Sequence, residues 1–182
     1  DKVDFDYCVE QGYAGPVDRL ARHQLLSRKS ILAHCINLSV TDYMLLKEYN
    51  PYIISNPESN ANNRVGKPDR SILPSYLIGT DGMSFDMISS LRSQYLLGNG
   101  LTEDLDELYT SFISRPSQLL SDFFEEPVGK IEPGYDADIA VLDYIPETPI
   151  NEKNLIGHLI FGAKNGKVHM TIAGGNIIYH KG

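Results

Sequence analysis

Three short apolar runs are separated by segments that carry apolar residues at helical spacing. Runs of this length predict buried strands, and they lie at Ser30–Cys35, Tyr52–Ile54 and Tyr76–Thr80. Pro16 opens a helical pattern that ends near Ser27. Ser39, with Asp42 three residues on, predicts a capping box for a second helix, and Ser84 is the expected cap of a third. Parallel strands with helical crossovers form an α/β layer, which is the fold class that we predict.

The pattern changes from mixed helix and strand to mainly strand near Glu126. Before this point, two helices are expected between Thr102 and Phe124, the second entered through Pro116. The elements expected after it are turns around a short strand at Gly129–Gly134, a strand at Ala137–Asp143, a helix at Asn154–Phe161, and a hairpin of Val168–Ala173 and Asn176–Tyr179 joined at Gly174-Gly175. We therefore expect a domain boundary between residues 1–126 and residues 127–182.

The composition is that of an ordinary globular protein. Of 182 residues, 42% are apolar and 22% are charged, which argues against a disordered chain. The 16 Lys and Arg residues against 24 Asp and Glu residues give a formal charge of −8, so nucleic acid is not an expected partner. No apolar stretch approaches the roughly 20 residues of a membrane helix, and no leader opens the sequence, so we expect a soluble, cytoplasmic protein. Cys8 and Cys35 lack metal-ligand spacing and are expected to be buried thiols.

Polar clusters directly follow the three predicted strands. They are His34-Cys35, Ser55-Asn56-Pro57-Glu58-Ser59-Asn60 and Gly79-Thr80-Asp81-Gly82. Each has a plain structural alternative, namely a core histidine, a loop of turn formers and an aspartate that stabilises a turn. Parallel α/β folds place their active sites at the carboxyl ends of the strands. An imidazole, a carboxylate and a hydrogen-bonding loop at one such edge would suit metal-assisted hydrolysis.

The order of these motifs resembles the amidohydrolase superfamily. The segments that carry the resemblance are Leu32–Cys35, Asn56–Asn60 with Gly66, and Gly79–Met83, which look like the sixth, seventh and eighth strands of a TIM-like (β/α)8 barrel. Gly129–Asp143 is similar to the segment by which such enzymes re-enter a small β-sandwich. The closest likeness is to the branch that holds guanine deaminase, the triazine chlorohydrolases and the SsnA-type aminohydrolases. The resemblance implies the last three barrel strands followed by part of the sandwich.

The resemblance also implies roles for individual residues. Asp81 would bind a single Zn²⁺ or Fe²⁺ ion and take part in proton handling, and His34 would hydrogen-bond the attacking water or the developing oxyanion. Asn56, Ser59 and Asn60 would shape the substrate pocket. The implied reaction is hydrolytic deamination, or dechlorination, of a small heterocyclic substrate at a C–N or C–Cl carbon.

The sequence departs from the family pattern at two places. Ser55 stands where many relatives carry His, which bears on the substrate side of the site, and Pro68–Ser75 is short for a crossover helix. The remaining histidines have no ligand-pair spacing and are interpreted as structural or solvated; they are His23, His158, His169 and His180.

Several ligands that the resemblance implies are missing from these 182 residues. They are a His-x-His on the first strand, a His on the fifth strand and a Glu three residues after it. We therefore expect the C-terminal part of a longer enzyme, because a whole barrel takes roughly 250 residues. On its own this chain should bind zinc weakly or not at all and be inactive. Its open sheet edges should be covered by the N-terminal portion or by a second copy. The alternative is a non-catalytic half-barrel that serves as a binding or assembly module.

Overall fold

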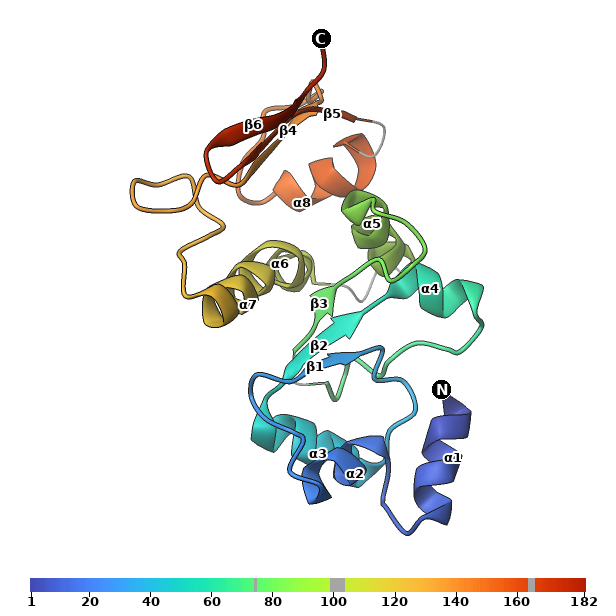
Figure 1. Ribbon diagram of the computed structural model, residues 1–182. Helices are drawn as coiled ribbons and strands as arrows, with labels where there is room; N and C mark the ends of the chain where they lie inside the picture. Colours follow the sequence, from blue (N-terminus) through green and yellow to red (C-terminus); the bar gives the residue numbers. More distant parts are fainter. Residues whose placement is uncertain (74, 99–103, 164–165) are drawn as a thin grey trace. The chain divides into compact units, whose positions relative to one another are not determined.

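A computed structural model describes residues 1–73, 75–98, 104–163 and 166–182 of the chain (Figure 1). Its internal contacts divide it into two units, Asp1–Phe85 and Asp86–Gly182, and each is described by itself. The domain boundary expected at residues 126/127 stays a prediction. Within the described residues, no helix has both the length and the apolar character that crossing a bilayer requires.

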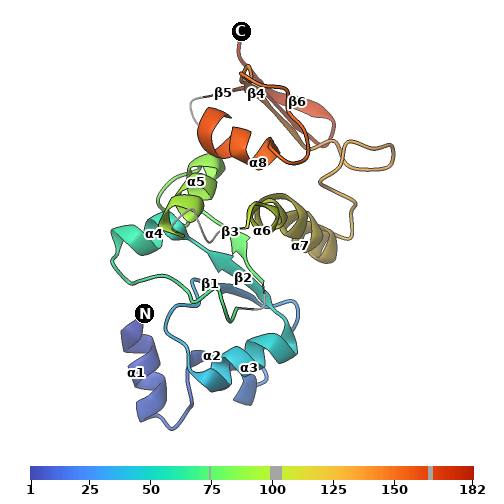
Figure 2. The same ribbon diagram turned by 180° about the vertical axis from the view of Figure 1, so that it is seen from behind.

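The first unit is built on a parallel sheet of three strands in the order β1-β2-β3. Leu32 pairs with Ile53, and Ile54 pairs with Leu77, and both pairings are parallel, as the sequence predicts. Helices α2 and α3 pack against each other on one side of this sheet (Figures 1 and 2). The elements are α1 (Lys2–Glu10), α2 (Pro16–Arg22), β1 (Ile31–Ala33), α3 (Val40–Tyr49), β2 (Tyr52–Ser55), α4 (Pro57–Asn62) and β3 (Leu77–Ile78). The α/β prediction is confirmed for this unit.

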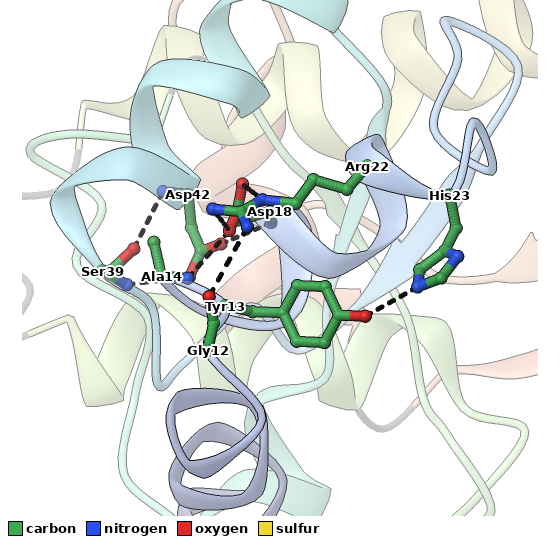
Figure 3. Close-up of polar contacts among 8 residues, drawn as sticks. All are labelled: Gly12, Tyr13, Ala14, Asp18, Arg22, His23, Ser39 and Asp42. Carbon is green, nitrogen blue, oxygen red and sulfur yellow. Dashed lines mark hydrogen bonds and ion pairs between the residues drawn. The ribbon is translucent and has the colours of Figure 1, made fainter.

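Helix α3 begins at the predicted capping box. The Ser39 hydroxyl accepts from the backbone N–H of Asp42 at 3.0 Å, and the Asp42 carboxylate accepts from the backbone N–H of Ser39 at 2.9 Å. The other carboxylate oxygen of Asp42 accepts the backbone N–H of Asp18, in the first turn of α2, at 2.8 Å (Figure 3). A Cβ on Gly15 would collide with this carboxylate. One buried aspartate therefore holds the beginnings of α2 and α3 together.

The second unit contains an antiparallel sheet in the order β4-β5-β6. Gly174 and Gly175, with φ of 52° and 77°, supply the two positive φ angles of a primed turn, which confirms the predicted closing hairpin. Helix α5 packs against η2, and α6 packs against α8. The elements are α5 (Met87–Leu97), α6 (Leu105–Tyr109), the π-helical turn η1 (Thr110–Ser114), α7 (Arg115–Phe124), β4 (Ile139–Asp143), α8 (Leu155–Gly157), the π-helical turn η2 (His158–Gly162), β5 (Lys167–Ala173) and β6 (Asn176–His180).

Several local predictions are wrong in detail. Asp86, and not Ser84, caps α5, because its carboxylate accepts from two N–H groups of the first turn at 3.0 Å each. No strand forms between Gly129 and Gly134, where φ values of 86° and 93° break an extended chain. Helix α2 stops at Arg22 instead of near residue 27. The expected helix start at Thr102 lies outside the described residues.

Both cysteines are buried free thiols, as predicted. Cys8 is 3% exposed and Cys35 is 8% exposed. Burial, together with the charge of Asp42, raises the pKa of the Cys35 thiol to about 12. Cys35 is therefore protonated and weakly nucleophilic at neutral pH.

Candidate active site

The carboxyl ends of the three parallel strands bring the candidate residues together. His34 follows β1, α4 follows β2 and Asp81 follows β3, so residues from three separate segments meet at one edge of the sheet. The backbone N–H of His34 donates to the carbonyl of Ile54 at 2.8 Å, which ties the end of β1 to β2. The N–H of Gly79 likewise donates to the carbonyl of Ser55 at 2.9 Å, which ties the end of β3 to β2.

The backbone at this edge is strained at three residues that are not glycine. His34, Cys35 and Asp81 have φ of 68°, 48° and 52°, in the left-handed region that residues with a Cβ rarely enter. Such conformations cost on the order of 1 kcal/mol or more each and gather at functional sites, where the surrounding fold enforces them. Here they turn the His34 and Asp81 side chains toward each other, with His34 Nε2 at 3.5 Å from Asp81 Oδ2.

The other ring nitrogen of His34, Nδ1, makes a hydrogen bond with Asn60. His34 Nδ1 lies 2.7 Å from Asn60 Oδ1. An amide oxygen can only accept, so Nδ1 carries the proton and donates it to Asn60. In the neutral ring, Nε2 then keeps a free lone pair on the side of Asp81.

The Asp81 carboxylate is also hydrogen-bonded at both oxygens. The Ser59 hydroxyl donates to Oδ2 at 2.7 Å, and the backbone N–H of Gly82 donates to Oδ1 at 2.7 Å. The Ser59 hydrogen bond, then that of Gly82, lower the pKa of Asp81 below its ordinary range, while partial burial opposes them; when the His34 ring is protonated, its charge lowers the pKa further. Asp81 is therefore an ionised carboxylate at neutral pH.

Four of the five residues singled out in the sequence form one connected cluster: Asn60, His34, Asp81 and Ser59. The fifth, Asn56, stands at the N-cap position of α4 and is 5% exposed. Its amide lies under Gly79, where an added Cβ would come within 2.5 Å of Asn56 Oδ1. The glycine before Thr80-Asp81 thus permits the close approach of β3 to the Asn-Pro turn.

A cavity of about 580 Å³ opens beside this cluster. His34, Asn60 and Asp81 line it, together with α1 and the β1 strand. Its volume lies in the range of small-molecule sites. The sequence reasoning missed Asn63, which also lines the cavity and whose amide donates to Ser59 Oγ at 3.4 Å. Asn63 lies four residues after Ser59, and this spacing predicts a contact between the two side chains only if residues 57–62 are known to be helical.

The described residues do not complete a metal centre. Among residues 1–73, 75–98, 104–163 and 166–182, no three or more His, Cys, Asp or Glu side chains converge as a metal site would need. A catalytic zinc site has three protein ligands as a rule. The ionised carboxylate of Asp81 and the lone pair of His34 Nε2 suit at most part of such a set. These residues therefore fit as a fraction of a metal site.

The other histidines make side-chain contacts of their own. His23 Nε2 lies 2.8 Å from the Tyr13 hydroxyl (Figure 3), and His158 Nδ1 lies 2.7 Å from the Tyr144 hydroxyl. The rings of His169 and His180 meet edge to face, with centroids 5.1 Å apart.

Solved structures share this fold. An adenosine deaminase from Xanthomonas campestris, with bound zinc, superposes with a TM-score of 0.79 at 22% identity over 97% of this chain and 43% of its own. The guanine deaminase of E. coli gives a TM-score of 0.76 at 19% identity over 94% of this chain and 44% of its own. At these identities the likeness is one of fold.

Sequence comparison gives the family. The 5-methylthioadenosine/S-adenosylhomocysteine deaminase of Syntrophomonas wolfei is 26% identical over 189 residues, which cover 97% of this chain and 44% of the relative. The chain thus spans less than half the length of the curated relatives that it matches. The model of the amidohydrolase family matches residues 7–178. The chain belongs to the amidohydrolase family.

Proposed function

We propose that this chain is part of a metal-dependent aminohydrolase that removes an amino group from a nitrogen heterocycle. The observation that carries the proposal is the connected cluster of Asn60, His34, Asp81 and Ser59 at the carboxyl ends of three parallel strands. The substrate class follows from the relatives, which are named for deamination of 5-methylthioadenosine and S-adenosylhomocysteine. Both are adenine nucleosides, so an aminopurine is the substrate that we favour over a chlorinated triazine.

We assign β1, β2 and β3 to the sixth, seventh and eighth strands of a (β/α)8 barrel. Their parallel order, and the placement of His34 and Asp81 after the outer two of the three strands, support this assignment. In the same proposal, residues 1–126 are a partial barrel and residues 127–182 are part of a β-sandwich. Strands β1 and β3 are the two edges of the sheet, and they need neighbours from outside this chain. The rest of the whole protein would supply those neighbours, with a second copy as the other possibility.

The reaction adds water across the ring carbon that bears the amino group. A new C–O bond forms, the C–N bond breaks, and ammonia leaves with the proton that the water has lost. A divalent ion, when bound, lowers the pKa of a water molecule to about 7. Asp81 would be one ligand of that ion, and the remaining ligands would lie in the part of the whole protein outside this chain.

His34 and Asp81 would handle the protons of this reaction. The proton on His34 Nδ1 is committed to Asn60, so only Nε2 is available to accept a hydrogen bond from water or to receive a proton. Asp81 keeps its charge because Ser59 and Gly82 stabilise the ionised form. The pair therefore offers a basic nitrogen and a carboxylate within 3.5 Å of each other.

The test is ammonia release by the whole protein. We would assay 5-methylthioadenosine, S-adenosylhomocysteine, adenosine and guanine, and follow chloride release from a chlorotriazine. Turnover of an aminopurine is expected, with kcat lowered on the order of a hundredfold or more by His34→Gln and by Asp81→Asn. Asn62→Ala is the matched control, since Asn62 is exposed on α4 and its amide donates a hydrogen bond to its neighbour Asn63. Binding of these compounds without turnover would instead favour a non-catalytic binding module.

A further inference from the structure

Helix α4 contacts both candidate catalytic residues through consecutive side chains. Ser59 donates to Asp81, which follows β3, and Asn60 accepts from His34, which follows β1. The helix follows the central strand β2, so it begins between the ends of the two outer strands. Ser59 and Asn60 are each only 3% exposed. Although Asn60 borders the cavity, side chains that are this buried and already hydrogen-bonded to other protein groups have little surface left for a substrate.

We propose that Asn60 and Ser59 are positioning residues, with Asn60 fixing the tautomer and ring orientation of His34 and Ser59 fixing the carboxylate of Asp81. That these two residues support catalysis rests on the proposed function, whereas the inferred tautomer of His34 is independent of it. This role differs from the substrate contacts that the resemblance implies for the same two residues.

The tautomer follows from the donor inventory of the groups in contact. Asn60 Oδ1 can only accept, so the 2.7 Å contact requires a proton on His34 Nδ1. A neutral imidazole has one proton, and Nε2 is then left as the acceptor that faces Asp81. A second group that holds one ring nitrogen is the usual device by which proteins select a tautomer and aim the other nitrogen.

The Asn60 side-chain amide makes its hydrogen bond through its oxygen and not through its NH₂ group. Its Nδ2 is buried and has no hydrogen-bond partner among the described residues, whereas Oδ1 has His34. Replacing this NH₂ group by oxygen, as in Asn60→Asp, therefore keeps the hydrogen bond with His34. Asn60→Leu keeps a similar volume but removes the acceptor. The two variants separate the hydrogen bond from the space that the side chain fills.

The first experiment measures the tautomer of His34 in the whole protein. ¹⁵N-labelled histidine is incorporated, long-range ¹H–¹⁵N spectra are recorded at a pH where the ring is neutral, and His34 is assigned by the loss of its signals in His34→Gln. We expect the proton on Nδ1 in the wild type and in Asn60→Asp, and a shift toward the Nε2–H form in Asn60→Leu. Asn62→Leu, an exposed change on the same helix, should leave the spectrum unchanged.

An Nε2–H tautomer in the wild type would overturn the proposal, because the Asn60 amide would then have to face His34 with its NH₂ group. The wild-type spectrum alone decides this point if Asn60→Leu fails to fold. An unchanged tautomer in a folded Asn60→Leu would overturn it equally. Neither result depends on catalytic activity.

The second experiment separates positioning from substrate contact by kinetics. In Ser59→Ala and Asn60→Leu, kcat should fall about ten- to a hundredfold, the usual effect of losing a group that orients a catalytic residue. KM should stay within about twofold, because no substrate contact is lost. Ser59→Thr retains the hydroxyl and should restore most of kcat. A rise in KM with unchanged kcat would overturn the positioning role, whereas an absence of turnover in the wild type would overturn the proposed function and leave the tautomer result standing.

Discussion

Asp18 is a buried carboxylate whose protonation should weaken the fold in acid. The backbone N–H of Ala14 donates to it at 2.8 Å, and the Arg22 guanidinium contacts both of its oxygens, at 3.0 and 3.1 Å (Figure 3). The hydrogen bond from Ala14, and then Arg22, lower the pKa of Asp18 below its ordinary value of 3.8, although burial opposes the shift. Because the folded-state pKa is the lower one, Asp18 stabilises the fold above the unfolded pKa, and this contribution is lost as the pH falls through the folded pKa.

The variant Asp18→Asn keeps an oxygen for the Ala14 N–H but loses the charge. The free energy of unfolding of the wild type should exceed that of the variant most at neutral pH, and the difference should shrink below about pH 4. Urea unfolding at a series of pH values measures it. Arg22→Met should remove part of the same pH dependence. A difference that stays constant from pH 7 to pH 2 would contradict the assignment.

Cys35 should react slowly with thiol reagents although it lines the cavity. With its pKa raised from 9.0 to about 12 by burial, the thiolate is roughly a thousandfold scarcer at neutral pH. A higher pKa also makes the remaining thiolate about twentyfold more nucleophilic, so the net loss of rate is roughly fiftyfold. Cys8→Ser leaves Cys35 as the only thiol, and its alkylation by iodoacetamide should be slower by this factor in the folded chain than in urea. Equal rates in both conditions would mean that Cys35 is accessible.

Helix α3 depends on both members of its capping box, but not equally. Ser39→Ala removes one hydrogen bond to the first turn and should lower the free energy of unfolding by about 1 kcal/mol. Asp42→Ala leaves two N–H groups without their acceptor, those of Ser39 and of Asp18 in α2. Each unpaired group that is shielded from water costs about 1–3 kcal/mol, so a loss of about 2–6 kcal/mol is expected.

Chemical unfolding of the two capping variants measures this difference. The exposed change Asn62→Ala serves as a baseline. An Asp42→Ala effect no larger than that of Ser39→Ala would indicate that the contact from α2 contributes nothing to stability.

Sequence patterns predict those elements whose signals are local. The capping box of Ser39 and Asp42, the parallel strands and the Gly174-Gly175 hairpin all follow from short-range chemistry, and the structure confirms them. Helix α4 escaped prediction because Asn56-Pro57 is typical of a turn, and proline at the first helical position is also a helix start. The cap of α5 was misplaced by two residues because Ser84 and Asp86 are both good N-cap residues.

The site was predictable in location but not in detail. Strand ends predict that His34 and Asp81 converge, because the strands are parallel. The partners of these residues depend on the helical turn of α4, which sends Ser59 to one strand end and Asn60 to another. The left-handed backbone at His34, Cys35 and Asp81 leaves no signal in residue type, since none of them is glycine.

At the scale of the whole molecule, the proposed function makes this site a fraction of a larger one. The chain spans 44% of its relative from Syntrophomonas wolfei, and within the described residues its parallel sheet has three strands, with β1 and β3 at the edges. The neighbours of β1 and β3 would also carry the groups that face His34 and Asp81 across the cavity. In the proposed function, the same missing strands would therefore complete both the sheet and the site.

Zinc binding should accordingly depend on the whole protein. The isolated 182-residue chain should hold far less than one zinc ion per molecule after dialysis, because among its described residues no three potential ligands converge. The whole protein should retain about one, measured by elemental analysis, and Asp81→Ala in the whole protein should reduce that content while Asn62→Ala leaves it unchanged. Stoichiometric zinc on the isolated chain, lost on Asp81→Ala, would show instead that these 182 residues hold a complete site.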